Sequence, residues 1–117
     1  AIFKNWDKDH IATFECFKIV LLNNSNQIKG VFQVSQGGIT GTVVDVRLIF
    51  AVALKSLTVG MILTHNHPSG TLKPSEADKS ITRKIKSAGA ILDIKVLDHI
   101  ILTPTGQYFS FADEGLL

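Results

Sequence analysis

The sequence is poor in the residue types that mark several classes of protein. Its 117 residues contain a single cysteine, Cys16, which excludes an internal disulfide and a cysteine-rich zinc site. No apolar run approaches the roughly 20 residues that a membrane-spanning helix needs, and no signal peptide is evident. Between Phe14 and Phe17, the thiol is expected to be a small buried side chain rather than a nucleophile. We therefore predict a reduced, cytoplasmic protein without a membrane span.

The sequence also lacks a strong excess of charge of either sign. Its 12 lysines and arginines against 10 aspartates and glutamates give a net charge of +2. A dedicated nucleic-acid-binding domain usually has a more basic balance. Four basic residues do fall in one predicted helix, partly on one face: Lys79, Arg83, Lys84 and Lys86. An ordinary solvated helix surface is the favoured interpretation of this cluster, and a nucleic-acid footprint is the alternative.

What the sequence does contain is the pattern of one α/β domain. Its 45% hydrophobic residues suffice for a single core, and no repeat or linker divides the chain, so we expect one domain over 1–117. Periodicity and turn residues predict strands over 14–22, 27–35, 59–65, 91–97, 99–103 and 108–111, and helices over 44–57 and 75–89. The mixed segment 1–12 is expected to be the end of a truncated N-terminal helix. This order predicts a single mixed β-sheet flanked by helices.

Several boundaries of these elements have a local explanation. The turn residues at 23–26 predict a hairpin between the first two strands. Asp45 is the expected N-cap of the first helix, and Gly89 is expected to end the second helix as its C′ residue. The strand 59–65 is continuously apolar, so we expect it to be central in the sheet and covered on both faces.

The residues that carry chemistry follow this central strand. His65 and His67 end the apolar run, and Asp78 comes eleven residues later, after a turn rich in proline and glycine. Histidines at i and i+2 of a strand project to the same side, so both imidazoles can reach one ion. Two imidazoles, a carboxylate and an open position form the ligand set of a catalytic zinc site. The open position would hold a water molecule whose pKa the metal lowers toward about 7.

The same residues have a structural interpretation. Ser75-x-x-Asp78 is also a capping box that opens a helix after Pro74, and Asp78 in the first turn favours the helix dipole. A lone His-x-His pattern is common by chance. The two interpretations are compatible, because a helix N-terminus is a rigid place to mount a ligand.

The spacing of these residues resembles that of a known family. His-x-His, seven residues, Ser, two residues and Asp is the metal motif of the JAB/MPN (JAMM) metalloprotease family, and His65, His67, Ser75 and Asp78 match it without deviation. The segments 65–78, 98–101 and 47–54 resemble the RadC branch of that family. The resemblance extends from about Phe14 to Leu117. It implies a JAB/MPN-like fold with cytidine-deaminase-like architecture, and Zn²⁺ held by the two histidines and Asp78.

A general base is the remaining catalytic requirement. Glu15 shares the strand parity of Phe17 and Ile19, which places its carboxylate on the core side, where burial would raise its pKa toward the value a proton shuttle needs. Alternatively, Glu15 lies half in solvent at the frayed start of the strand. The resemblance assigns it the role, because JAMM proteins carry a general acid/base glutamate on an early strand. Asn23 stands where the RadC pattern has aspartate. Two competing carboxylates, Glu76 and Glu114, are less well placed.

The mechanism implied is hydrolysis of peptide or isopeptide amide bonds. Zinc-activated water would attack a carbonyl, Glu15 would move the proton, and Ser75 would donate a hydrogen bond to the oxyanion. On ligand type zinc is preferred, although Fe²⁺, Mn²⁺ or Co²⁺ suits the same set. The alternative function is a non-catalytic RadC-type module that binds DNA or protein, since RadC-like proteins carry a DNA-repair label. Its DNA affinity would fall steeply with salt.

Two further histidines complete the inventory. His99 follows Asp98 at a predicted strand start, and the two residues form a candidate pair that supports a metal ligand, or else His99 is simply hydrogen-bonded at a strand edge. His10 is expected on the surface. A Ser-His-Asp triad stays open from sequence, because triads are spatial arrangements. A cytidine-deaminase-type zinc site fails, because it requires Pro-Cys-x-x-Cys and Cys16 is the only cysteine.

Overall fold

The described part of the chain folds around one five-stranded sheet, with strand order β2-β1-β3-β4-β5. The structure is a computed structural model that describes residues 14–36 and 44–117, so the predicted helix end at 1–12 and His10 lie outside the described residues. Its strands are β1 (Cys16–Leu22), β2 (Ile28–Gln36), β3 (Gly60–Asn66), β4 (Lys95–Leu102) and β5 (Tyr108–Ser110), and its helices are α2 (Val46–Lys55) and α3 (Glu76–Ile91). Only β3 and β4 pair in parallel, through the crossover helix α3, and the other neighbours are antiparallel. The predicted single mixed sheet is confirmed.

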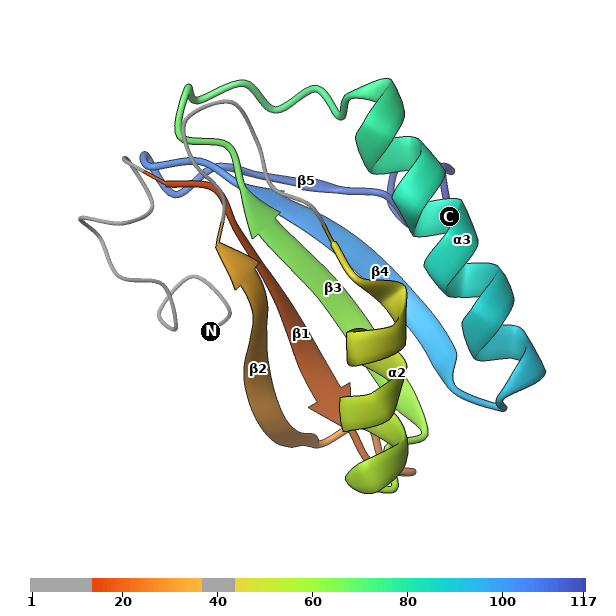
Figure 1. Ribbon diagram of the computed structural model, residues 1–117. Coiled ribbons are helices and arrows are strands. Elements are labelled where there is room, and N and C mark those ends of the chain that lie inside the picture. Colours follow the sequence, from red (N-terminus) through yellow and green to blue (C-terminus); the bar gives the residue numbers. More distant parts are fainter. Residues whose placement is uncertain (1–13, 37–43) are drawn as a thin grey trace.

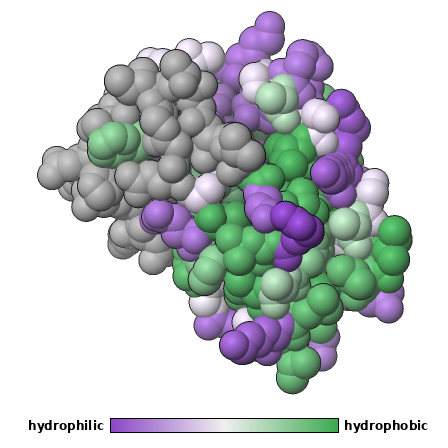
Figure 2. All heavy atoms as spheres, viewed as in Figure 1, coloured by the Kyte–Doolittle hydropathy of each residue, from purple (hydrophilic) through white to green (hydrophobic). Residues whose placement is uncertain are grey.

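Both described helices lie on the same face of the sheet (Figure 1). The core between them and the strands consists of buried side chains from β1, α2, β3 and α3, including Phe17, Ile19, Ile49, Phe50, Met61, Leu63 and Ile85. Leu48 and Leu54 of α2 are exposed. Figure 2, in the same view as Figure 1, shows apolar surface interspersed with polar side chains on this side of the molecule. In the part of the chain that the structure describes, no helix is both long and apolar enough to cross a bilayer.

The predicted hairpin and helix start are confirmed, and hydrogen bonds explain both. Asn23 Oδ1 accepts from the main-chain nitrogens of Ser25 and Gln27, at 2.9 and 3.0 Å, which closes the turn between β1 and β2. An asparagine thus performs the acceptor role for which an aspartate was expected. Asp45 caps α2 by accepting from the nitrogen of Arg47 at 2.9 Å.

The central strand β3 lies between β1 and β4, as its apolar sequence predicts. All of its residues are buried except Ile62, which is half-buried. Alternate residues of β3 face the helices: Met61 and Leu63 belong to the core, and His65 is the last of the series. The strand therefore carries the first histidine of the motif into the interior, at the end of the sheet where α3 begins.

Two predicted boundaries were wrong. Helix α3 continues to Ile91, and Gly89 lies within it rather than ending it. A Cβ on Gly89 would lie 2.4 Å from the carbonyl oxygen of Ile94, so close packing against the chain that leads into β4, rather than a left-handed cap, requires glycine there. That chain returns at once, because the nitrogen of Ile94 donates to the oxygen of Gly89 at 2.8 Å.

The predicted strands 91–97 and 99–103 form the single strand β4. The register changes at Leu97, because Met61 pairs with Val96 whereas Ile62 pairs with Asp98. This bulge shifts the alternation by one residue. His99 consequently pairs with Leu63 and is fully buried on the face that looks toward the helices.

Candidate metal centre

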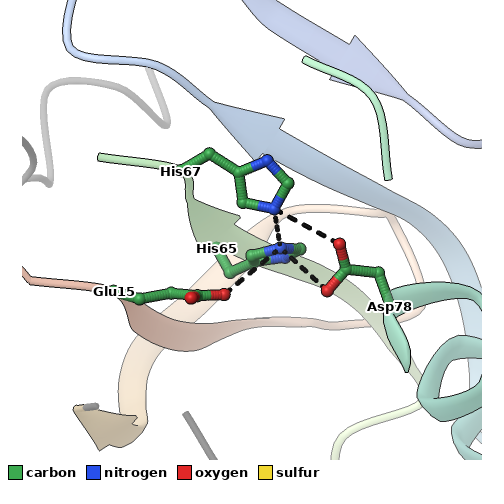
Figure 3. Close-up of side chains that lie close together, drawn as sticks. All are labelled: Glu15, His65, His67 and Asp78. Carbon is green, nitrogen blue, oxygen red and sulfur yellow. Dashed lines mark hydrogen bonds and ion pairs between the residues drawn. The ribbon is translucent and has the colours of Figure 1, made fainter. Parts of the chain in front are cut away.

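Four predicted site residues meet at one end of the sheet (Figure 3). Glu15 immediately precedes β1, His65 lies near the end of β3, His67 follows it, and Asp78 lies in the first turn of α3. One ligand atom from each residue lies within 4.8 Å of the others. We call these residues, Glu15, His65, His67 and Asp78, the ligand cluster. Three separate elements contribute to it, so the arrangement depends on the packed fold.

The distances within the ligand cluster fit a tetrahedral metal site. With Zn–N bonds of 2.0–2.1 Å, two ligand atoms on a tetrahedron lie about 3.3 Å apart. His65 Nε2 lies 3.0 Å from His67 Nε2 and 3.3 Å from Asp78 Oδ1. His67 Nε2 lies 3.2 Å from Asp78 Oδ2. The two histidines therefore supply one nitrogen each, and Asp78 supplies two carboxylate oxygens, each of which lies at a suitable separation from one of the nitrogens.

Glu15 stands next to these three donor residues at a longer distance. Its Oε1 atom lies 3.8 Å from His65 Nε2, on the side away from Asp78 in Figure 3. Its side chain is 18% exposed. The carboxylate is therefore partly open to solvent and lies beside the three donor residues without contacting them as closely as they contact one another.

Both interpretations of the Ser75–Asp78 pattern hold at once. The nitrogen of Asp78 donates to Ser75 Oγ at 3.0 Å, and the nitrogen of Ser75 donates to Asp78 Oδ2 at 2.8 Å, forming a capping box. Burial raises the pKa of Asp78, but close contacts with the imidazoles of His65 and His67 outweigh burial and bring that pKa well below its usual range. The carboxylate is thus held ionised and oriented, as a metal ligand must be.

A hydrogen bond on the far side of the His67 ring fixes its orientation. Its Nδ1 donates to the carbonyl oxygen of Thr71 at 2.7 Å, in the turn that follows β3. This leaves Nε2 as the atom that faces the ligand cluster. Burial lowers the pKa of His67, but the hydrogen bond to Asp78 outweighs it, and the net pKa is raised.

His65 is supported by a buried chain of polar groups that ends on α3. Thr82 Oγ1 donates its only hydrogen to the carbonyl oxygen of Asp78 at 2.7 Å, so it must accept from His99 Nδ1, which lies 2.5 Å away. Burial lowers the pKa of His99 well below its usual value, so its ring is neutral and Nε2 is an acceptor. His65 Nδ1, 2.7 Å from that atom, must therefore donate to it. This order leaves the lone pair of His65 Nε2 directed into the cluster.

The predicted Asp98–His99 pair is only half correct. His99 does support a candidate ligand, but the Asp98 carboxylate does not bind its ring. It accepts instead from the nitrogen of His99 at 2.7 Å, from Ser110 Oγ at 2.5 Å and from the nitrogen of Ala112 at 3.0 Å. Asp98 thus anchors β5 and the following turn, and Thr82 is the partner of the His99 ring.

Sequence reasoning missed Thr82 and Asn66. Asn66, the middle residue of His-x-His, is fully buried; its Oδ1 accepts from the nitrogen of Cys16 at 2.7 Å and its Nδ2 donates to the oxygen of Phe14 at 2.6 Å. A polar residue inside an apolar strand was the available signal for Asn66. Thr82 lies one helical turn after Asp78. This spacing alone does not indicate a role for Thr82, because the role depends on β4 packing against α3.

A cavity of about 260 Å³ opens against the ligand cluster, with Glu15, His65 and Asp78 in its wall. Two larger hollows, of about 370 and 590 Å³, lie beside the C-terminal half of α3 and share no lining residue with the cluster. Because residues of the ligand cluster line the smaller cavity and not the two larger ones, we place the candidate site in the smaller cavity.

Comparisons with known proteins found a matching family model and several similar curated proteins. The family model of the RadC-like JAB domain matches residues 3–116. A "UPF0758 protein" of Flavobacterium johnsoniae is 58% identical over 102 residues, which cover 87% of this chain and 44% of the relative. Another from Aromatoleum aromaticum is 40% identical over 116 residues, 97% of this chain and 52% of the relative. The chain therefore spans about half the length of these curated relatives.

Proposed function

Because the chain belongs to the RadC-like JAB domain family, we propose that it is a zinc-dependent hydrolase of peptide or isopeptide amide bonds. One observation carries the proposal: four groups of the right chemistry converge within 4.8 Å beside a cavity. A purely structural use of this carboxylate and these imidazoles would not require an adjacent, partly exposed glutamate. We also propose a cytoplasmic location, which suits a buried thiol such as that of Cys16.

The residues that would hold the metal are His65, His67 and Asp78. Their donor set favours Zn²⁺, although Fe²⁺, Mn²⁺ or Co²⁺ would accept the same ligands. A metal bound there would supply Lewis-acid activation of a water molecule and of the substrate carbonyl.

The protein groups around that position would handle protons and charge. Glu15 Oε1 would accept a proton from the attacking water and return it to the leaving amine. Ser75 Oγ accepts from the nitrogen of Asp78 and keeps its own hydrogen, which would be donated to the carbonyl oxygen as negative charge develops. His99 and Thr82 would hold His65 in the tautomer that presents Nε2.

Metal content and hydrolysis of a peptide library together test the proposal. We expect about one zinc per chain, lost in His67→Ala and Asp78→Ala but kept in Asp113→Ala, an exposed aspartate outside the ligand cluster. Glu15→Gln is expected to keep zinc and lose turnover by at least about a hundredfold. Wild-type protein that takes up no zinc, or Glu15→Gln with unchanged turnover, would contradict the proposal.

The alternative, a non-catalytic module that binds DNA or protein, stays a prediction. Arg83, Lys84 and Lys86 are exposed on α3, which favours it, whereas Lys79 lies 3.5 Å from Glu76 and is partly neutralised. If this surface bound duplex DNA, affinity would fall steeply with salt and would weaken in charge-removing variants of these residues. Affinity that is absent at low salt would dismiss the DNA form of the alternative.

A further inference from the structure

The cavity beside the ligand cluster has a second, apolar wall. Its lining residues outside the ligand cluster are Phe17, Val44, Ala77 and Ile81. We call the space between these four side chains and the cluster the apolar pocket. The hydrolysis proposed for the ligand cluster needs only the polar wall, so the apolar wall has no role in it.

The elements that position the ligands also build the apolar pocket. Phe17 lies two residues after Glu15 and therefore on the same side of the β1 segment. Ala77 and Ile81 are one helical turn apart on α3 and flank Asp78. Val44 precedes the N-cap of α2. Phe17 belongs to the core, and Val44 and Ile81 are partly buried and pack against it, so three of the four wall residues are held in place by core packing.

We propose that the apolar pocket binds an uncharged apolar side chain of the substrate, next to the scissile amide bond. The inference rests on the proposed function, since it specifies the substrate of that same site. The volume of about 260 Å³ is just below the ~300–1,000 Å³ of pockets that hold whole drug-sized ligands, so it suits one side chain rather than an entire small molecule.

The charges around the pocket decide against polar occupants. Among the described residues that line the pocket, Glu15 and Asp78 carry carboxylates, which repel an acidic side chain. A lysine or arginine side chain would lose its hydration against Phe17, Val44 and Ile81, and the carboxylates are engaged in the cluster. A branched or linear aliphatic side chain pays neither penalty, and each methylene that it buries is worth about fourfold in affinity.

Hydroxamates of graded side chain test the pocket without requiring turnover, because the hydroxamate group binds zinc directly. Zinc-loaded protein is titrated by calorimetry with acetohydroxamate, 3-methylbutanohydroxamate and 4-aminobutanohydroxamate. We expect the branched compound to bind at least about tenfold more tightly than acetohydroxamate, and the amino compound no more tightly than acetohydroxamate. Equal affinities, or preference for the amino compound, would overturn the inference while leaving the proposed function intact.

Variants of α3 locate the effect. Ala77→Phe fills the pocket and should abolish the preference for the branched compound over acetohydroxamate. Ser80→Phe, an equally bulky change at an exposed α3 position outside the pocket, should keep the preference. Ile81→Ala enlarges the pocket and should favour 3-phenylpropanohydroxamate. A preference that survives Ala77→Phe would overturn the inference, whereas zinc-loaded protein that binds none of the hydroxamates would overturn the proposed function itself.

Discussion

Asn66 holds the main chain on both sides of Glu15. Its amide oxygen accepts from the nitrogen of Cys16 and its amide nitrogen donates to the oxygen of Phe14, at 2.7 and 2.6 Å. The middle residue of the His-x-His motif therefore aligns the candidate base with the two histidines that flank it in sequence. The end of β3 thus positions His65 and His67 directly, and it positions Glu15 through hydrogen bonds from Asn66 to the main chain on either side of Glu15.

Replacing Asn66 with alanine is expected to misplace Glu15, because it removes the hydrogen bonds from Asn66 to the nitrogen of Cys16 and to the oxygen of Phe14. Turnover should fall by about tenfold to a hundredfold, with zinc still bound, and the free energy of unfolding should fall by about 2–4 kcal/mol. Peptide hydrolysis, zinc content and urea unfolding measure the three quantities. Thr64→Val is the control, because among the described residues Thr64 Oγ1 is buried without a hydrogen-bond partner. If both variants turned over substrate equally, Asn66 would not position the base.

Thr82→Val is expected to weaken zinc binding by about tenfold, although Thr82 touches no metal. The change removes the hydroxyl that accepts from His99 Nδ1, so His99 loses the partner that fixes its tautomer and, through it, that of His65. Competition with a chromophoric chelator measures the affinity. Thr82→Ser retains the hydroxyl and should bind zinc as the unmodified protein does; equal affinity in the valine and serine variants would contradict the chain of hydrogen bonds.

Removing either helix cap should cost similar stability but have different effects on catalysis. Ser75→Ala and Asp45→Ala each remove an N-cap and are expected to lower unfolding free energy by about 1 kcal/mol, or about 4 °C in Tm. Only Ser75→Ala should also lower kcat, by about a hundredfold, because its hydroxyl would face the oxyanion. Thermal unfolding and peptide hydrolysis are measured on both variants. A similar kcat loss in Asp45→Ala would indicate a general effect of stability.

Two glycine-to-alanine changes are expected to alter stability in opposite directions. Gly89→Ala places a Cβ 2.4 Å from a main-chain oxygen and should cost about 1–3 kcal/mol despite the better helix propensity of alanine. Gly30→Ala in β2 meets nothing within 4 Å and should stabilise by about 0.5 kcal/mol. Urea unfolding compares the two. Stabilisation by Gly89→Ala would mean that α3 and the chain before β4 are less tightly packed.

The Cys16 thiol is expected to make stability fall at alkaline pH. It is 2% exposed, and burial raises its pKa above the ordinary value of 9.0. Above about pH 9 the unfolded chain loses this proton while the folded chain keeps it, so the folded state binds more protons and its stability falls as pH rises. Unfolding free energies at pH 8 and 10 should therefore differ less in Cys16→Ala than in the unmodified protein. An identical pH dependence would contradict the burial of this thiol.

The sequence predicted most of this fold because local signals agree with the tertiary structure. Asp45 and Ser75 cap helices, and Asn23 closes a turn, all through contacts within a few residues. The predicted end at Gly89 was wrong because its requirement for glycine comes from Ile94, on the chain that follows. The predicted break before His99 was wrong because a bulge, set by pairing with β3, changes the alternation without ending the strand.

The candidate site divides in the same way. His65, His67 and Asp78 were predictable because short, fixed spacing carries their arrangement. The hydrogen bonds that support His65 were not predictable, because Thr82 and His99 are 17 residues apart and meet only when α3 packs on β4. The contact between Asn66 and the chain around Glu15 depends likewise on the pairing of β1 with β3.

The Asp78 carboxylate closes the first turn of α3 and also faces the imidazoles of the ligand cluster. The stability of the helix start and the affinity of the cluster for a cation are therefore thermodynamically coupled. A cation bound at the cluster would stabilise the first turn of α3, and unfolding of that turn would weaken binding of the cation. The main-chain hydrogens of Asp78 and Lys79, which bond to Ser75, would then exchange with solvent more slowly as the site fills. Hydrogen exchange at two adjacent amides would report occupancy of the site without any added probe.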